Sequence, residues 1–169
     1  QQVIPMESVR VYAKAQNRTA LGIMHAYMLM NPQATLADLR KAFPNSLNPD
    51  RGVPEVFIYA EEKGTQHDWD GFFKAEDEVL AMGDDRQVAV VKMWTKPSLD
   101  RLIAQAKKYG IVVAESVEAD KGFGKKGSFR LEYLNGWTPP SKKGKSSLLW
   151  LWILLILLVV GGLVYYFTR

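Results

Sequence analysis

The sequence predicts an α+β protein: a small domain of helices and a mostly antiparallel sheet, followed by one C-terminal transmembrane helix. Three observations predict this class. Apolar residues recur with helical spacing before residue 43 and again between residues 98 and 106. Short runs of β-branched and aromatic residues, bounded by turn residues, lie between and after those helices. The last long stretch of the chain is apolar and uncharged.

The N-terminal region predicts a long helix. From about Met6 to Met30 the pattern is helical, with an interruption expected near residues 16–19. The pair Asn31-Pro32 ends this helix, because a residue before proline is disfavoured in the helical conformation. The apolar face of the helix is formed by residues spaced three or four apart, namely Leu21, Met24 and Met28.

A second, shorter helix is expected over residues 36–43, with Thr35 as its N-cap and Pro44 as its stop. A long helix, a short turn and a short helix opening on threonine are similar to the first two helices of many winged-helix domains. The residues that follow, 44–52, have the composition of a turn and not of the recognition helix that such a domain requires.

The rest of the domain is expected to contain short strands and one more helix. The helix is capped by Thr95 or Ser98, carries Pro97 in its first turn and stops at Gly110. A final strand over residues 128–134 is expected to form a hairpin with the strand before it. The expected strands are residues 56–59, 71–73, 79–82, 88–91, 111–114 and 128–134, with a hairpin turn at 83–86.

Two stretches carry a resemblance to a known group of proteins. They read AFPNSLNPDRGV and GFFKAEDEVLAMGDDRQVAVVKMWTKPSLDRLIAQAKKYGI. They resemble an uncharacterised bacterial α+β domain, in which a Phe-Pro-x-Ser-Leu turn precedes a hairpin, a tryptophan and a helix ending in Tyr-Gly. That domain is often found near restriction or defence genes. The resemblance covers about residues 20–113 and implies a bacterial cytoplasmic module, but no activity.

Residues 148–167 predict the transmembrane helix. They contain no charged residue, and twenty residues of helix extend about 30 Å, which matches the hydrocarbon core of a bilayer. Aromatic residues that favour the headgroup interfaces lie near its two ends: Trp150 and Trp152 at one, Tyr165 and Tyr166 at the other. The chain therefore divides into a soluble domain (1–136), a juxtamembrane linker (137–147), the transmembrane helix (148–167) and a short tail (168–169).

The positive charges beside this helix predict its orientation. Lys142, Lys143 and Lys145 precede it and only Arg169 follows it, so the positive-inside bias places the N-terminal domain in the cytoplasm. These four cations equal the formal net charge of +4, and the rest of the chain is neutral. The basic balance therefore gives no support for nucleic-acid binding by the domain. The three lysines are expected to contact anionic lipid headgroups.

A loop rich in glycine and lysine, residues 121–127, is the most distinctive local motif. It lacks the spacing of a phosphate-binding P-loop. Three interpretations stay open: the tip of a hairpin, a contact with anionic lipid or a partner, and a nucleic-acid contact. The residues that would make such a contact are Lys121, Phe123, Lys125, Lys126 and Arg130.

No combination of residues predicts catalysis. The chain has no cysteine, which excludes disulfides, thiolate metal sites and cysteine nucleophiles. The segment His67-Asp68-Trp69-Asp70 could ligate a divalent ion, and Glu61 with Lys63 matches part of a magnesium-dependent nuclease site, but both patterns are common in polar loops. We expect no catalytic residue, no metal and no cofactor.

These observations favour a tail-anchored membrane protein that displays a small cytoplasmic interaction or adaptor domain at the membrane surface. Its expected partners are membrane lipids and a protein. One alternative is a membrane-tethered nucleic-acid-binding protein related to defence, and a second is a magnesium-dependent nuclease.

Overall fold

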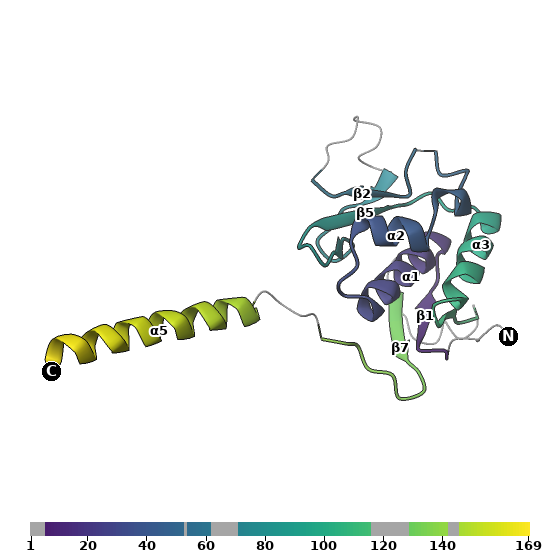
Figure 1. The fold of residues 1–169 in the computed structure, drawn as a ribbon. Coiled ribbons are helices and arrows are strands. Elements are labelled where there is room, and N and C mark those ends of the chain that lie inside the picture. The colour runs from purple at the N-terminus through teal and green to yellow at the C-terminus, as the bar shows by residue number, and fades with distance from the viewer. Residues whose placement is uncertain (1–5, 53, 62–70, 116–128, 142–145) are drawn as a thin grey trace.

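The computed structural model describes residues 6–52, 54–61, 71–115, 129–141 and 146–169. Within these residues the protein is α+β, as the sequence predicts: two small sheets and three helices form the domain, and an apolar helix follows at the C-terminal end. Figure 1 shows the arrangement.

The first sheet has strand order β6-β1-β7. Its central strand β1 (Val9–Ala13) is parallel to β6 (Ile111–Val113) and antiparallel to β7 (Phe129–Tyr133). The alternate residues Val9 and Val11 are fully buried, as expected for a strand with one face toward the core.

The second sheet is antiparallel and is built around β5 (Gln87–Val91). This strand pairs with β2 (Phe57–Tyr59), β3 (Phe72–Phe73) and β4 (Leu80–Ala81). The β4–β5 hairpin confirms the prediction made from its turn residues, and Asp85 in that turn has the positive φ of 66° that a tight turn requires.

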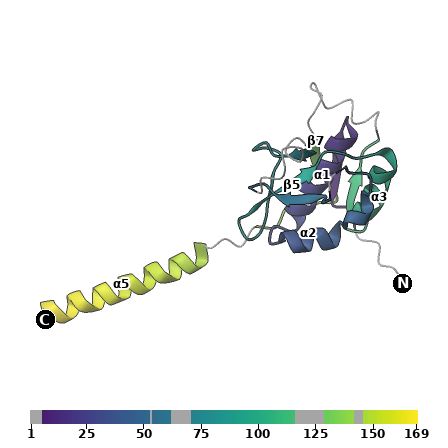
Figure 2. The same cartoon turned by 90° about the horizontal axis from the view of Figure 1, so that it is seen from above.

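Helix α1 (Gln16–Met30) runs through the middle of the domain, as Figures 1 and 2 show. It contacts the strands of the first sheet, β4 of the second sheet and helix α3. Gly22 allows a close approach to β1, because a Cβ at this position would lie 2.6 Å from Cγ1 of Val11. Met24 and Met28 are buried in the core, so these methionines pack the domain and do not form an outer face.

The two other helices of the domain begin at threonine caps, as predicted. Helix α2 (Leu36–Ala42) has a capping box, in which the Thr35 side chain accepts from the Asp38 N–H and the Asp38 carboxylate accepts from the Thr35 N–H. Helix α3 (Lys96–Lys107) opens on Thr95, and Gly110 follows it with a φ of 79°. After α2 the chain forms only η1 (Asn45–Leu47), a single turn of 3-10 helix, where a winged-helix domain would have its recognition helix.

Two predictions were wrong. The helical pattern from Met6 to Met30 covers two elements, because residues 9–13 form β1 and α1 begins only at Gln16. The predicted hairpin between β6 and β7 does not form, because β1 lies between these strands and pairs with both. The loop that was expected to close this hairpin lies outside the described residues.

Helix α5 (Ser146–Thr168) has 23 residues and extends about 35 Å at the usual helical rise. Figures 1 and 2 show it outside the domain. No residue of the stretch Trp150–Thr168 belongs to the domain core.

Candidate functional site

Helix α5 is the one described helix that is long and apolar enough to cross a membrane. Its residues Trp150–Thr168 have a mean hydropathy of 2.3, and none of this stretch is buried against the rest of the protein. A core helix of a soluble protein would be covered, because exposed apolar surface of this size is unfavourable in water. The exposed apolar helix therefore indicates insertion into a membrane.

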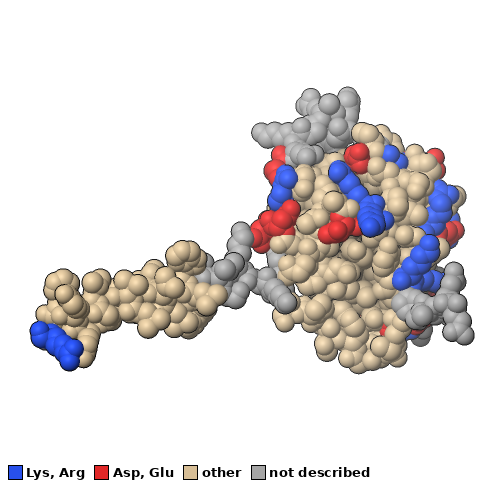
Figure 3. Space-filling model, viewed as in Figure 1, with Lys and Arg blue, Asp and Glu red and all other residues tan. Residues whose placement is uncertain are grey.

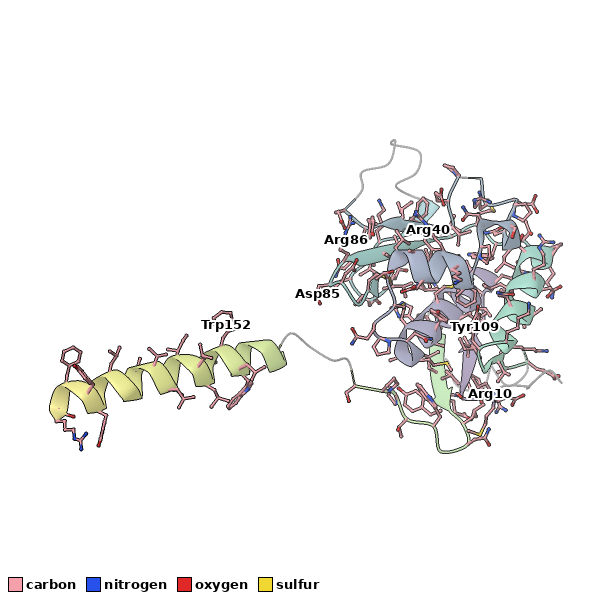
Figure 4. All side chains as sticks on the ribbon, viewed as in Figure 1. Arg10, Arg40, Asp85, Arg86, Tyr109 and Trp152 are labelled. Carbon is pink, nitrogen blue, oxygen red and sulfur yellow. The ribbon has the colours of Figure 1, made fainter. Side chains whose placement is uncertain are left out.

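The aromatic residues of α5 lie near its two ends, where the aromatic belts of a transmembrane helix lie. Trp150 and Trp152 are 67% and 65% exposed near one end, and Tyr165 and Tyr166 are 66% and 76% exposed near the other. Figure 4 shows Trp152 projecting outward from the helix. Figure 3 shows no charge along α5 except at its C-terminal end, where the Arg169 guanidinium lies 5.7 Å from the Tyr165 ring centroid.

The chain remains attached to the domain for several residues after β7. The Leu134 N–H donates to Ser8 O at 2.9 Å, and the Asn135 side chain donates to Glu7 O at 2.8 Å. Trp137 packs edge-on against Tyr133, with ring centroids 5.1 Å apart. These contacts hold the segment before Pro139 against the sheet that contains β1.

The covalent connection between the domain and α5 is short. Only residues 142–145 lie between Ser141 and the first residue of α5, Ser146. Five peptide units extend at most about 18 Å, so the surface around Ser141 stays within that distance of the start of the helix. Lys142, Lys143 and Lys145 lie outside the described residues.

A groove of about 640 Å³ lies on this surface. We call it the juxtamembrane groove. It is formed by the C-terminal half of α1, the α1–α2 turn, α2, Tyr109 after α3, and Pro140 and Ser141 of the linker. Its lining residues are Tyr27, Asn31, Pro32, Gln33, Ala34, Asp38, Lys41, Ala42, Tyr109, Pro140 and Ser141.

An aromatic cluster forms one side of the juxtamembrane groove. Tyr27 packs edge-on against both Phe43 and Tyr109, with centroid distances of 5.2 and 5.3 Å. The Tyr109 hydroxyl donates to Ala42 O at 3.4 Å, which fixes that ring beside α2. Burial and the neighbouring Tyr109 and Asp38 raise the pKa of Tyr27, so its hydroxyl is neutral at physiological pH. Figure 4 shows the position of Tyr109 in the domain.

Two opposite charges from α2 line the same groove. The Asp38 carboxylate accepts from the Thr35 N–H at 2.9 Å and from the Thr35 hydroxyl at 3.1 Å, and these bonds, with the nearby Lys41, lower the pKa of Asp38. Asp38 is therefore ionised at neutral pH. Lys41 lies one helical turn further along α2. The groove thus combines a carboxylate, an ammonium group and two tyrosine rings.

Of the residues predicted to make contacts at the glycine- and lysine-rich loop, the structure describes Arg130. Its guanidinium lies 4.2 Å from the centroid of the Tyr12 ring, and the Tyr12 hydroxyl donates to Glu132 at 3.0 Å. Arg130 is thus held against the outer face of the first sheet. Lys121, Phe123, Lys125 and Lys126 lie outside the described residues.

The residues suggested for metal chemistry give no site in the described part of the chain. The Glu61 carboxylate is 2.6 Å from Nη2 of Arg86, whose hydrogen bonds lower the pKa of Glu61. Lys63 and His67 lie outside the described residues. Among the residues that are described, no three His, Asp or Glu side chains come together as metal ligands would.

The guanidinium of Arg51, in the turn that follows α2, is engaged within its own loop. It donates to the backbone carbonyls of Asn45, Asn48 and Pro54. Arg51 therefore stabilises the turn after α2.

The sequence did not predict the juxtamembrane groove. Only Thr35, through its capping role, pointed to the orientation of Asp38. Tyr27 and Tyr109 lie 82 residues apart in the sequence, and their proximity follows from tertiary packing.

Comparisons with protein-family models, with curated proteins and with solved structures found no match, so the function has to be argued from the exposed helix and the groove beside it.

Proposed function

We propose that this chain is a tail-anchored membrane protein whose α+β domain acts as a binding module at the cytoplasmic surface. The observation that carries the proposal is helix α5, which exposes apolar residues from Trp150 to Phe167. The short connection to the domain adds a second constraint, because it keeps the domain beside the headgroup layer and gives it little freedom to move away.

The charge distribution supports the cytoplasmic orientation. Three lysines precede α5 and one arginine follows it, and the positive-inside bias retains the more positive flank in the cytoplasm. The same lysines favour an anionic membrane surface by about 1 kcal/mol each. Membrane lipids are therefore the first expected partner.

A binding role fits the described surface better than a catalytic one. The juxtamembrane groove offers side chains that hold and orient a ligand, but no nucleophile activated by a neighbouring base among its described residues. A protein partner at the membrane surface is the second expected partner. The resemblance to a bacterial domain found near defence genes stays an expectation.

Nucleic-acid binding receives less support. The chain without its anchor-flanking cations is neutral, and η1 occupies the place of a recognition helix. The absence of a salt-dependent mobility shift of DNA or RNA by the full chain in detergent would remove this alternative. A shift abolished by Lys125→Glu with Lys126→Glu would restore it.

The orientation is tested by single-cysteine labelling, for which the cysteine-free chain is a clean background. Ser46→Cys places a thiol on the exposed turn η1, and Thr168→Cys places one at the far end of α5. In intact cells a membrane-impermeant maleimide should label Thr168→Cys and leave Ser46→Cys unmodified. After permeabilisation both should be labelled. Labelling of Ser46→Cys in intact cells would contradict the proposed orientation.

A further inference from the structure

We propose that the juxtamembrane groove binds a phosphoethanolamine group, the zwitterionic headgroup of a membrane phospholipid. The proposal rests on the membrane anchoring inferred above and assigns a ligand class to the surface nearest the bilayer. Its argument has three parts: a site for the ammonium, a site for the phosphate, and the position of the groove.

The ammonium site is formed by Asp38, Tyr27 and Tyr109. Asp38 is ionised and exposed to the groove, so it accepts hydrogen bonds from a primary ammonium in a charge-assisted contact. The Tyr27 and Tyr109 rings pack edge-on to each other, with centroids 5.3 Å apart, and both residues line the groove together with Asp38. An ammonium group is attracted both by the carboxylate and by the ring faces.

The phosphate site is formed by Lys41. Residues three apart on a helix have Cβ atoms about 5–6 Å apart and lie on one face, so Asp38 and Lys41 present opposite charges side by side. The two charges of phosphoethanolamine are separated by a two-carbon bridge, which gives the ligand a dipole of comparable length. A simple anion would meet the Asp38 carboxylate, and a simple cation would meet the Lys41 ammonium. A zwitterion satisfies both, and the primary ammonium of phosphoethanolamine supplies the N–H donors for the Asp38 carboxylate that a choline headgroup lacks.

The position of the groove selects a lipid as the source of this group. Pro140 and Ser141 form part of the groove wall, and α5 begins five residues after Ser141. The Ser141 end of the groove is thus held within about 18 Å of the helix start. The headgroup layer adds roughly 5–8 Å to each side of the hydrocarbon core, so the groove and the headgroups are within reach of each other.

The test uses the full chain in nanodiscs and a thiol placed in the groove. Gln33→Cys introduces the single cysteine at an exposed lining residue, and Ser46→Cys serves as the control outside the groove. Maleimide labelling is compared in discs of phosphatidylcholine alone, with added phosphatidylethanolamine, and with added phosphatidylglycerol. We expect phosphatidylethanolamine to slow labelling of Gln33→Cys several-fold and to leave Ser46→Cys unchanged.

Two charge variants test the assignment of Asp38 to the ammonium and of Lys41 to the phosphate. In the Gln33→Cys background, Asp38→Asn keeps a hydrogen-bond acceptor for the Thr35 N–H but removes the charge, and Lys41→Gln removes the cation. Each substitution should abolish most of the protection of Gln33→Cys from labelling. We expect this because each lowers the affinity for the headgroup on the order of tenfold. The matched controls are Asp100→Asn and Lys107→Gln, which make the same changes on α3 at residues that do not line the groove. They should leave the protection intact.

The outcomes distinguish a lipid headgroup from soluble phosphoethanolamine, and a zwitterionic ligand from an anionic one. Soluble phosphoethanolamine added to phosphatidylcholine discs should also protect Gln33→Cys, at millimolar concentration, since the headgroup makes the contacts. Equal protection by phosphatidylglycerol, or protection that survives Asp38→Asn, would overturn the zwitterion assignment. Absence of protection in every arm would overturn the site.

Failure of the anchoring itself would be recognised separately. A chain that does not enter nanodiscs contradicts the proposed function, and the groove is then still tested in detergent with soluble phosphoethanolamine. If phosphoethanolamine protects Gln33→Cys in detergent and Asp38→Asn abolishes this protection, the result supports the site without the membrane. No protection there overturns it.

Discussion

The imidazole of His25 lies between α1 and the segment that leads into β4. Its Nε2 is 3.0 Å from Glu78 O, and its ring packs against Phe129 with centroids 4.9 Å apart. Burial lowers the pKa of His25 below the ordinary value of 6.5, although the Glu78 carbonyl and the charges of Asp77 and Glu78 act in the opposite direction. The folded domain therefore favours the neutral imidazole.

This arrangement predicts a pH dependence of stability. The unfolded chain protonates His25 near pH 6.5, while the folded chain protonates it only at lower pH, so the unfolded state binds more protons between these values. The contribution of neutral His25 to stability is present above pH 6.5 and is lost as the pH falls toward the lowered pKa. Urea unfolding of the full chain in detergent, followed from pH 8 to pH 5, measures this loss.

His25→Gln should remove that part of the pH dependence. The chain has two histidines, and His67→Gln measures how much of the pH dependence of stability comes from His67. A loss of stability below pH 6.5 that persists unchanged in His25→Gln would show that protonation of this imidazole does not destabilise the fold.

Residue-level features were predictable where the chemistry is local. Thr35 and Thr95 cap helices because each hydroxyl accepts from a backbone N–H three residues later. The groove residues were not predictable in the same way. Asp38 has a visible capping role, but its place beside Tyr27 and Tyr109 depends on how α1, α2 and the end of α3 pack.

At the scale of elements, α1 and the sheet around β1 form the centre of the domain. The strand β1 was missed because its alternating pattern merges with the helical pattern of α1, although Val9 and Val11 alternate with Arg10 and Tyr12 as a strand requires. Its pairing with β7 joins residues 118 apart, such as Tyr12 and Arg130. Sequence adjacency favoured the simpler β6–β7 hairpin, and only tertiary packing inserts β1 between them.

The close packing of α1 on this sheet makes Gly22 sensitive to substitution. In Gly22→Ala the new methyl group would lie 2.6 Å from Cγ1 of Val11 and 3.3 Å from Phe129, and Val11 is fully buried on a central strand. We expect a destabilisation of about 1–2 kcal/mol, because the overpacking exceeds the gain in helix propensity. Thermal or urea unfolding measures the change.

Gly161→Ala is the matched control, because no atom lies within 4 Å of the corresponding Cβ on α5. It should leave the unfolding of the domain unchanged. Equal stability of Gly22→Ala and the original chain would mean that α1 and the sheet are not packed as closely as the structure shows.

At the scale of the whole molecule, a neutral domain is joined to an apolar helix with basic flanks. This division was predictable from the sequence, because the length and hydrophobicity of a membrane span depend on composition alone. The attachment of residues 134–137 to the domain was not, since it depends on contacts with Ser8, Glu7 and Tyr133. The residues that follow this attachment, Pro140 and Ser141, line the juxtamembrane groove.

The insertion of α5 is the central claim, and alkaline extraction of cell membranes tests it most directly. Leu157 lies at the middle of the apolar stretch and is 62% exposed, and an arginine there costs about 2.5–3.5 kcal/mol in helix insertion. The original chain should stay in the membrane pellet after the alkaline wash, as should the Leu157→Val control, whereas a larger fraction of Leu157→Arg should appear in the supernatant. Release of the original chain by the wash would contradict a membrane-spanning α5.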